Sequence, residues 1–253
     1  MHKSRSLIQG IILRRCLKRG DKGNKKVWVA IYKDIYGNLC FGIFIIVCFL
    51  MENGWRILFM TGGRNTFFAM MSRMKYIERW ALMRNSVKEN ISEHSLETAI
   101  IAHALAVIGN VRLGKNYNPE HISVLGIYHD CTEIITGDMP TPVKYNNDDI
   151  CMAYKEIEAE AASRIINMLP DDLQEYYKCY FGGEEDSQAL KLVKAADKLS
   201  ALVKCIEEEK AGNKEFVCAK KSVTKSIENM LCEEADIFCK EFLEAYGKTL
   251  DEL

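Results

Sequence analysis

The apolar positions of the chain follow a helical pattern from Phe67 onward. Apolar residues recur there every three or four positions, and no stretch after residue 66 alternates apolar and polar residues over a useful length. Neither an internal repeat nor a glycine-rich phosphate loop interrupts this pattern. It therefore predicts an all-α body over residues 66–250.

Capping and stop signals divide this body into segments, because Ser, Asn and Pro favour helix starts and Gly favours helix ends. The predicted segments are an apolar stripe from Phe67 to Trp80 and helices from Ser92 to Gly109, Asn118 to Gly137, Asp148 to Met168, Asp171 to Phe181, Ser187 to Asn213 and Glu215 to Tyr246. Together they predict a bundle of helices without a sheet.

Two of these helices place polar groups on their apolar faces. His129 and Glu133 lie four and eight positions after Leu125, so both are expected to point into the core. Asp130 follows His129 directly, and Asp197 shares its face with apolar residues of a later helix. Burying an imidazole with carboxylates is costly unless the groups pair or bind a cation. The pattern therefore favours a metal-dependent hydrolytic site.

His94 completes a candidate ligand set. It lies in the first turn of the helix that follows Ser92, where its side chain can reach another helix. With His129, Asp130 and Asp197 it supplies two imidazoles and two carboxylates. Such a set suits a divalent transition ion such as manganese, iron, cobalt, nickel or zinc better than calcium or magnesium. The His-Asp doublet alone is a weak signal, and the other two residues strengthen it.

The charges of the chain are unevenly distributed. Residues 1–65 hold 12 Lys and Arg against 3 Asp and Glu, a balance of +9, whereas the rest of the chain has a balance of -10. The overall net charge of -1 hides this difference. An acidic body argues against a nucleic-acid-binding groove, which requires clustered basic side chains.

The ten cysteines are scattered, and no CxxC pair occurs among them. Several, such as Cys205 and Cys239, lie on apolar helix faces. This distribution is typical of reduced, buried thiols in a cytosolic protein, and it disfavours a cysteine-based zinc site.

The first 65 residues form an extension of a different character. Residues 1–38 are basic, and Leu39–Met51 is an apolar run of 13 residues. As a helix this run spans about 20 Å, less than the roughly 30 Å hydrocarbon core of a bilayer. Three interpretations remain open: a dispensable extension read from an upstream start, a membrane anchor or signal, and a β-hairpin around Tyr36-Gly37-Asn38. The alternative starts are Met51, Met60, Met70 and Met71.

Six ordered groups of residues resemble one known family. His94, the His129-Asp130 doublet and Asp197 match the H…HD…D signature of the HD-domain metal-dependent phosphohydrolases. The sequence motifs around these residues are similar to those of the bacterial HD-domain 5′-deoxynucleotidases. The six motifs are Arg79-Trp80-Ala-Leu-Met-Arg-Asn85, Asn90-Ile-Ser-Glu-His-Ser-Leu96, Tyr128-His-Asp-Cys-Thr-Glu133, Gly137-Asp-Met-Pro-Thr-Pro-Val-Lys-Tyr145, Val193-Lys-Ala-Ala-Asp-Lys198, and Lys204-Cys-Ile-Glu-Glu208 with Ala211-Gly-Asn213. The match covers residues 66–250, and the first 65 residues have no counterpart in it.

The resemblance implies an HD-domain helical bundle and a metal-dependent activity. His94, His129, Asp130 and Asp197 would bind one divalent cation, which in the family is cobalt, manganese or copper. The enzyme would remove the 5′-phosphate from deoxyribonucleoside 5′-monophosphates, as in nucleotide salvage. It would act in the cytoplasm as a homodimer, unless the Leu39–Met51 run anchors it to a membrane.

The resemblance also implies roles for residues around the metal. Without the resemblance, Arg79 would be interpreted as a solvated surface arginine and Trp80 as a core aromatic residue. By resemblance, Arg79 would orient the phosphate and take part in catalysis, and Trp80 would lie by the sugar and disfavour a ribose 2′-hydroxyl. Glu133 would act on the attacking water as general base. The nucleotide pocket would be lined by Asp138, Met139, Pro140 and Thr141, with Asp138 also catalytic and with His94, Asp130 and Asp197 also touching the substrate.

Other functions fit parts of the pattern. Another HD-type nucleotide phosphohydrolase or a phosphodiesterase would use the same ligands. A non-catalytic nucleotide-binding HD module would be favoured by the loss of a ligand, but all four are present. A purely structural helical protein gives no reason for His129 and Asp197 to face inward.

Overall fold

The computed structural model describes residues 65–140, 144, 147–183 and 186–253. The chain divides into two compact units, Met1–Thr61 and Gly62–Leu253, and the described residues all belong to the second. The Leu39–Met51 run and the extension up to residue 64 therefore lie outside the described residues.

The described part of the chain is helical, which confirms the all-α expectation. Its one pairing of β type is an isolated bridge between Glu78 and Asn90. The elements in order are α4 (Phe67–Met71), η1 (Ser72–Tyr76), α5 (Ile91–Leu113), α6 (Pro119–Tyr128), α7 (Glu133–Thr136), α9 (Asp148–Ile166), α10 (Asp171–Tyr177), η2 (Lys178–Phe181), α11 (Ser187–Lys210), η3 (Lys214–Phe216), α12 (Val217–Asn229), α13 (Glu233–Glu241), η4 (Leu243–Gly247) and η5 (Leu250–Glu252).

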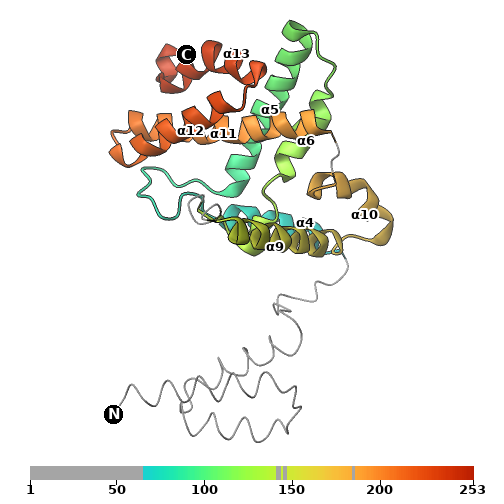
Figure 1. Cartoon of the computed structure of the whole chain (residues 1–253). Helices are drawn as coiled ribbons and strands as arrows, with labels where there is room; N and C mark the ends of the chain where they lie inside the picture. The colour runs from blue at the N-terminus through green and yellow to red at the C-terminus, as the bar shows by residue number, and fades with distance from the viewer. Residues whose placement is uncertain (1–64, 141–143, 145–146, 184–185) are drawn as a thin grey trace, which may run out of the picture. The chain divides into compact units, whose positions relative to one another are not determined.

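Helices α5, α6 and α11 form the centre of the bundle, with α12 and α13 packed on one side (Figure 1). Leu105, Leu125 and Leu199 are buried where the three central helices meet. Each such side chain contributes about 1.5–3 kcal/mol to folding. Gly126 lets α6 approach α5 closely, because a Cβ there would lie 2.8 Å from the Cα of Ala99.

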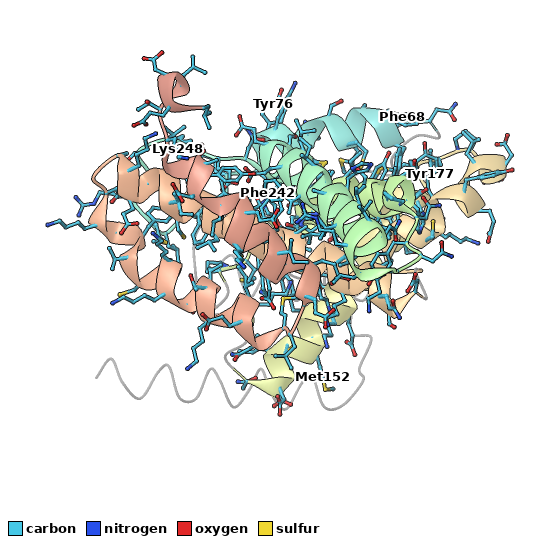
Figure 2. The ribbon with its side chains drawn as sticks, turned by 90° about the horizontal axis from the view of Figure 1, so that it is seen from above. Phe68, Tyr76, Met152, Tyr177, Phe242 and Lys248 are labelled. Carbon is cyan, nitrogen blue, oxygen red and sulfur yellow. The ribbon has the colours of Figure 1, made fainter. Side chains whose placement is uncertain are left out.

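A second buried cluster, rich in aromatic residues, joins α4 to α9 and α10. Phe67 is fully buried and its ring contacts Tyr177 with centroids 5.0 Å apart. Its neighbour Phe68 is exposed, although the sequence pattern placed it on the same apolar stripe, and lies beside Tyr177 (Figure 2). The predicted stripe also ends early, because the helical turns stop at Tyr76 rather than Trp80.

Two helix starts differ from the expected ones by one or two residues. The N-cap of α5 is Asn90 rather than Ser92: its side chain accepts the backbone N–H groups of Ser92 and Glu93, and Glu93 bonds back to the Asn90 N–H. This reciprocal capping box satisfies two otherwise unpaired backbone donors. The cap of α11 is likewise Asp186 rather than Ser187.

Gly109 does not end α5, contrary to expectation. The helix continues to Leu113 and ends at Gly114, whose φ of +65° requires a glycine-like conformation. Gly109 instead accommodates the ring of Tyr117, since a Cβ at that position would lie 2.5 Å from it. The glycine is therefore needed for close packing.

The C-terminal segment is also broken where a single helix was expected. Between α12 and α13 the backbone of Leu231 adopts a φ of +49°, and the side chain of Leu231 is exposed. This turn brings Cys232 into the core beside Glu234. As two short helices, α12 packs on α11 and α13 packs chiefly on α5.

A buried ion pair fixes the loop that precedes α5. Glu208 on α11 accepts the backbone N–H of Ser86 at 2.8 Å and also bonds to the side chains of Lys204 and Asn213. Burial alone would raise the pKa of Glu208, but these donors lower it to about 2. The loop is thus tied to the same helix that carries Asp197.

Glu208→Ala is expected to destabilise the protein by about 3–5 kcal/mol, because it leaves the Lys204 ammonium buried without its partner. The free energy of unfolding from urea titration measures this. Glu209→Ala is the matched control: Glu209 pairs with Lys220 on the surface, where an ion pair contributes about 0–1 kcal/mol. Equal losses for the two variants would contradict a structural role for the buried pair.

Candidate active site

The His-Asp doublet lies at a break in the chain. The expected single helix from Asn118 to Gly137 is wrong, because α6 ends at Tyr128 and α7 begins at Glu133. Between them, Cys131 donates its backbone N–H to the Tyr128 carbonyl and Glu133 donates to that of Asp130. The doublet therefore lies in a turn between α6 and α7, and not inside one helix.

The structure brings four predicted residues into one cluster, which we call the four-donor cluster: His94 from α5, His129 and Asp130 from the end of α6, and Asp197 from α11. One possible ligand atom from each lies within 4.8 Å of the others. His94 Nε2 is 3.2 Å from Asp197 Oδ1, and His129 Nε2 is 3.0 Å from Asp130 Oδ2.

Both imidazoles point an unpaired nitrogen at this cluster. The Nε2 atoms of His94 and His129 are buried, and neither has a hydrogen-bond partner of acceptable geometry. A buried polar atom without a partner costs about 1–3 kcal/mol. Two such atoms facing two carboxylates fit a divalent cation, which would accept both nitrogen lone pairs.

The remaining ring nitrogens have partners that select the required tautomer. His129 Nδ1 lies 2.8 Å from the Gly126 carbonyl, which can only accept a proton. His94 Nδ1 lies 3.0 Å from Ser200 Oγ, and Ser200 donates its own proton to Glu97. Both Nδ1 atoms are therefore the donors, which leaves each Nε2 free as a metal ligand.

Glu97 and Ser200 were not predicted as site residues. Each lies three positions after a ligand on its helix, Glu97 after His94 and Ser200 after Asp197. Residues at that spacing share a helix face. The spacing places them near the cluster, but only the packing of α5 against α11 brings the two together.

The charges of the cluster are strongly coupled. Burial alone would lower the pKa of His129, but the Asp130 carboxylate more than offsets this and raises it to about 9. Burial likewise opposes ionisation of Asp130 and Asp197, yet the neighbouring histidines hold the pKa of both carboxyls below the ordinary value. Without a cation the cluster therefore holds a proton on His129 at neutral pH.

Glu133 is buried beside the cluster at the start of α7. Its Oε2 has no hydrogen-bond partner. Burial, with the negative charges of Asp130 and Asp138, raises the pKa of Glu133 to about 9. A cation bound in the cluster would weaken the effect of the Asp130 and Asp138 charges on the pKa of Glu133, because its positive charge offsets theirs.

Arg79 and Trp80 lie beside the cluster, in the loop between η1 and α5. The side chain of Arg79 is only 11% exposed, so the interpretation as a solvated surface arginine is wrong. Its Nη2 lies 4.0 Å from Asp197 Oδ1. Trp80 donates its backbone N–H to Asp138 at 3.3 Å, and its ring packs on Phe216.

The proline-containing turn lies only partly within the described residues. Asp138 contacts Trp80 as above, and Met139 and Pro140 follow it as half-buried residues. Thr141 lies outside the described residues. The side of the cluster next to Arg79 thus also carries Asp138, and Asp197 keeps 34% of its side chain accessible to solvent.

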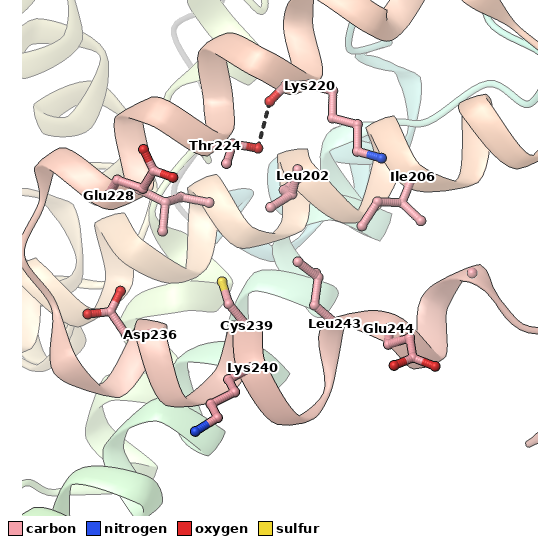
Figure 3. A pocket seen from close by; sticks show the side chains of 12 residues that line it. Leu202, Ile206, Lys220, Thr224, Glu228, Asp236, Cys239, Lys240, Leu243 and Glu244 are labelled. Atoms are coloured by element: carbon pink, nitrogen blue, oxygen red, sulfur yellow. Dashed lines mark hydrogen bonds between the residues drawn. The ribbon is translucent and has the colours of Figure 1, made fainter.

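A separate cavity lies between α11, α12, α13 and η4 (Figure 3). Its volume is about 640 Å³, with Leu202, Ile206 and Leu243 among its apolar lining residues. None of the four donors lines it. The cavity is therefore distinct from the candidate active site, although both use α11.

Comparison with known proteins gives a consistent result. The family described as 5′-deoxynucleotidase YfbR-like matches residues 66–246. A 5′-deoxynucleotidase of Vibrio atlanticus is 45% identical over 188 residues, covering 74% of this chain and 97% of the relative. A 5′-deoxynucleotidase of Erwinia tasmaniensis is 46% identical over 188 residues, covering 74% and 95%.

Solved structures share the fold. An HD-domain phosphohydrolase of Listeria innocua superposes with a TM-score of 0.63 at 22% identity, covering 72% of this chain and 88% of its own. The HD phosphohydrolase of cyanophage S-2L, bound to dA and one catalytic zinc ion, superposes with a TM-score of 0.51 at 15% identity, covering 70% and 96%. At these identities the likeness establishes the helical architecture alone.

Proposed function

The chain belongs to the 5′-deoxynucleotidase YfbR-like family, and we propose that it hydrolyses deoxyribonucleoside 5′-monophosphates to deoxynucleoside and phosphate at the four-donor cluster. Family membership confirms the resemblance found in the sequence. The protein is a metal-dependent phosphoric monoester hydrolase. One observation carries the assignment of the site: two partnerless imidazole nitrogens face two carboxylates beside a buried arginine.

The proposed metal ligands are His94, His129, Asp130 and Asp197. The free Nε2 atoms and the fixed Nδ1 protons support this set. Cobalt, manganese or copper is the proposed cation, since mixed imidazole and carboxylate ligands suit transition ions. Once bound, a divalent cation supplies Lewis acidity to a phosphoryl oxygen and lowers the pKa of a water molecule.

Arg79 is proposed to bind the phosphate. Its guanidinium carries five N–H donors in a planar fork that matches phosphate oxygens. Nη1 is occupied by Glu89 at 3.2 Å, while Nη2 faces the cluster. In this position Arg79 stabilises the charge that accumulates on the phosphoryl oxygens as the bond between phosphorus and the 5′-oxygen breaks.

Glu133 is proposed as the general base. A water oxygen attacks phosphorus while Glu133 takes a proton from that water, and the bond between phosphorus and the 5′-oxygen breaks. The 5′-oxygen takes up a proton from solvent and leaves as the hydroxyl of the deoxynucleoside. Asp130 is excluded from this role because it serves as a ligand. Asp138, Met139, Pro140 and Thr141 line the nucleotide pocket in this proposal, with Asp138 among the catalytic groups and Trp80 beside the sugar.

The direct test is phosphate release by the full chain. Matched pairs of deoxyribonucleoside and ribonucleoside monophosphates are incubated with protein loaded with cobalt or manganese. The expected result is release from the deoxy substrates in preference to the ribo substrates. An intact, metal-loaded protein that releases no phosphate from any deoxynucleotide would overturn the proposal.

Metal binding at pH 7 is expected to release about one proton from His129. The pKa of His129 is raised to about 9 without metal, so the ring is protonated at pH 7 and must lose that proton to become a ligand. Metal affinity therefore rises with pH and levels off above about 9. Calorimetric titration with manganese in buffers of different ionisation enthalpy measures the release.

The control for this titration is His103→Gln, because His103 is exposed on α5 and outside the cluster. It should leave proton release unchanged. Binding heats that do not depend on the buffer at pH 7 would show that His129 is not protonated beforehand.

A homodimer is proposed as the assembly. Support comes from an exposed apolar stripe on α5, formed by Leu96, Ile100, Val107 and Val111, with Phe242 next to the last two. Two copies with antiparallel α5 helices would set Leu96 of one against Val111 of the other and bury both stripes. Ile100→Asp is expected to sediment as a monomer, and an unchanged dimer would contradict this interface.

A cytoplasmic location is proposed from the cysteines, because every cysteine in the described residues is a free thiol. Helix α5 is long and apolar enough to cross a membrane, but its packing against α6 and α11 places it at the centre of the bundle. The alternative is membrane association through Leu39–Met51. Partitioning of the full chain into vesicles separates the two.

A further inference from the structure

The carboxylate of Glu89 accepts hydrogen bonds from both Arg79 and Trp80, the two residues proposed to contact the nucleotide. Glu89 Oε1 accepts from Arg79 Nη1 at 3.2 Å, and Glu89 Oε2 accepts from the indole Nε1 of Trp80 at 2.9 Å. The Glu89 side chain is 12% exposed. Each oxygen therefore holds a different partner in a largely dry environment, where such bonds are stronger than in water.

The backbone places Glu89 directly across from Arg79. Arg79 donates its N–H to the Glu89 carbonyl at 2.9 Å, and Ile91 donates to the Ile77 carbonyl at 3.0 Å. These bonds close the base of the loop between the two residues. Glu89 thus lies at the closed end of the loop that carries Trp80, where backbone bonds as well as side-chain contacts fix its position.

Trp80 has an unusual backbone that needs such support. Its φ is +58°, a conformation that bulky residues rarely adopt and that costs on the order of 1–3 kcal/mol. Four polar contacts hold it: Glu89 at the indole, Asp138 at the backbone N–H, and both the Asn85 amide and the Met83 backbone N–H at the carbonyl. The Glu89 contact is the one that acts on the ring itself.

Arg79 depends on the same carboxylate. Burial would lower the pKa of Arg79, but Glu89 and then Asp197 raise it, so the guanidinium stays charged in a dry site. Glu89 engages only Nη1, which leaves Nη2 facing the cluster. An arginine already held in one rotamer loses less conformational freedom when phosphate binds.

We propose that Glu89 is a positioning residue that sets the phosphate-facing guanidinium of Arg79 and the sugar-facing indole of Trp80 relative to each other. The inference rests on the proposed function, in which these two residues contact the nucleotide. Glu89 hydrogen-bonds to Arg79 and Trp80, and its Oε1 lies 3.9 Å from Nδ1 of the proposed ligand His94. It couples recognition of the phosphate to recognition of the deoxyribose, because one side chain fixes both.

The kinetic test uses Glu89→Gln in the full, metal-loaded chain. Glutamine keeps the shape, but its amide nitrogen is a donor and cannot accept from Arg79 or Trp80, so one of the two bonds is lost. We expect KM for deoxyribonucleoside monophosphates to rise and kcat/KM to fall about 10–100-fold, the effect typical of outer partners. The preference for deoxy over ribo substrates should fall as well.

Glu78→Gln is the matched control. Glu78 lies in the same bridged segment and pairs with Lys88, but that pair is exposed on the surface. This variant should keep wild-type KM and deoxy preference. Manganese affinity should be unchanged in both variants, which separates an effect on Arg79 and Trp80 from an effect on the ligand His94.

A spectroscopic measurement tests the same contact without turnover. The chain has three tryptophans, so Trp28→Phe with Trp55→Phe leaves Trp80 as the only tryptophan, whose emission is excited selectively over that of the tyrosines. In this background Glu89→Gln should shift the Trp80 emission and increase its quenching by acrylamide, whereas Glu78→Gln should not.

The outcomes separate the two proposals. Wild-type activity with unchanged KM, substrate preference and Trp80 emission in Glu89→Gln would overturn the positioning role and leave the function intact. A wild-type protein without phosphatase activity would overturn the function, while a shifted Trp80 emission would still support the contact. A Glu89→Gln protein with lowered kcat alone and unchanged KM would also contradict positioning.

Discussion

Asp197→Asn is expected to lose most of the phosphatase activity, with kcat/KM about 10³-fold below wild type. Asparagine keeps the size of the side chain but offers a neutral oxygen, so the cation loses an anionic ligand. Lewis-acid stabilisation amounts to several kcal/mol, and each 1.36 kcal/mol corresponds to about a factor of ten. Asp197 also lies 3.2 Å from His94 Nε2, so its charge supports a second ligand.

The measurement combines kcat/KM with metal content after dialysis. Metal content should fall along with activity, and excess manganese should restore part of the rate. The matched control is Asp236→Asn, an exposed carboxylate on α13 that lines the separate cavity. If Asp197→Asn keeps a full complement of metal and full activity, the four-ligand set is wrong.

Glu133→Gln is expected to lower kcat by about 10²–10⁴-fold while metal content stays at the wild-type level. Glutamine fills the same buried space but cannot take a proton from the attacking water. This pattern differs from that of Asp197→Asn, in which metal is lost as well. The comparison therefore separates a base from a ligand within one site.

The pH dependence of the wild-type enzyme tests the same role. Without metal, burial and the neighbouring carboxylates raise the pKa of Glu133 to about 9. A base acts only when deprotonated, so the rate should rise with pH until Glu133 is ionised, and a bound cation should shift that rise to lower pH. In Glu133→Gln this rise of the rate with pH should disappear.

Glu120→Gln is the control for both measurements, since Glu120 is an exposed carboxylate in the first turn of α6. It should keep the wild-type rate and pH profile. Should Glu133→Gln also keep them, Glu133 is not the base, although family membership and the metal site would be unaffected.

Arg79 contacts both Asp197 and Glu89, the residues changed in two of these experiments. Asp197 lies 4.0 Å from its Nη2 and Glu89 lies 3.2 Å from its Nη1, so the guanidinium is held between a proposed metal ligand and a proposed positioning residue. Loss of Asp197 should affect metal and rate together. Loss of Glu89 should affect KM and substrate preference with metal retained.

The sequence by itself determined the helical class and several helix limits. Apolar spacing and capping residues are local signals, and a start such as Asn118-Pro119 was confirmed because its hydrogen bonds form within one turn. The inward direction of His129 also followed from periodicity. These features depend on residues at most a few positions apart, which the sequence displays directly.

Only the tertiary structure decided where helices break and which groups meet. The chain leaves the helix after Tyr128, and no local sequence signal predicts that turn. Glu89 meets Arg79 ten positions away, and Glu208 meets Ser86 across 122 positions. Such contacts depend on how helices pack in space, because residues far apart in sequence become neighbours only when the core has formed.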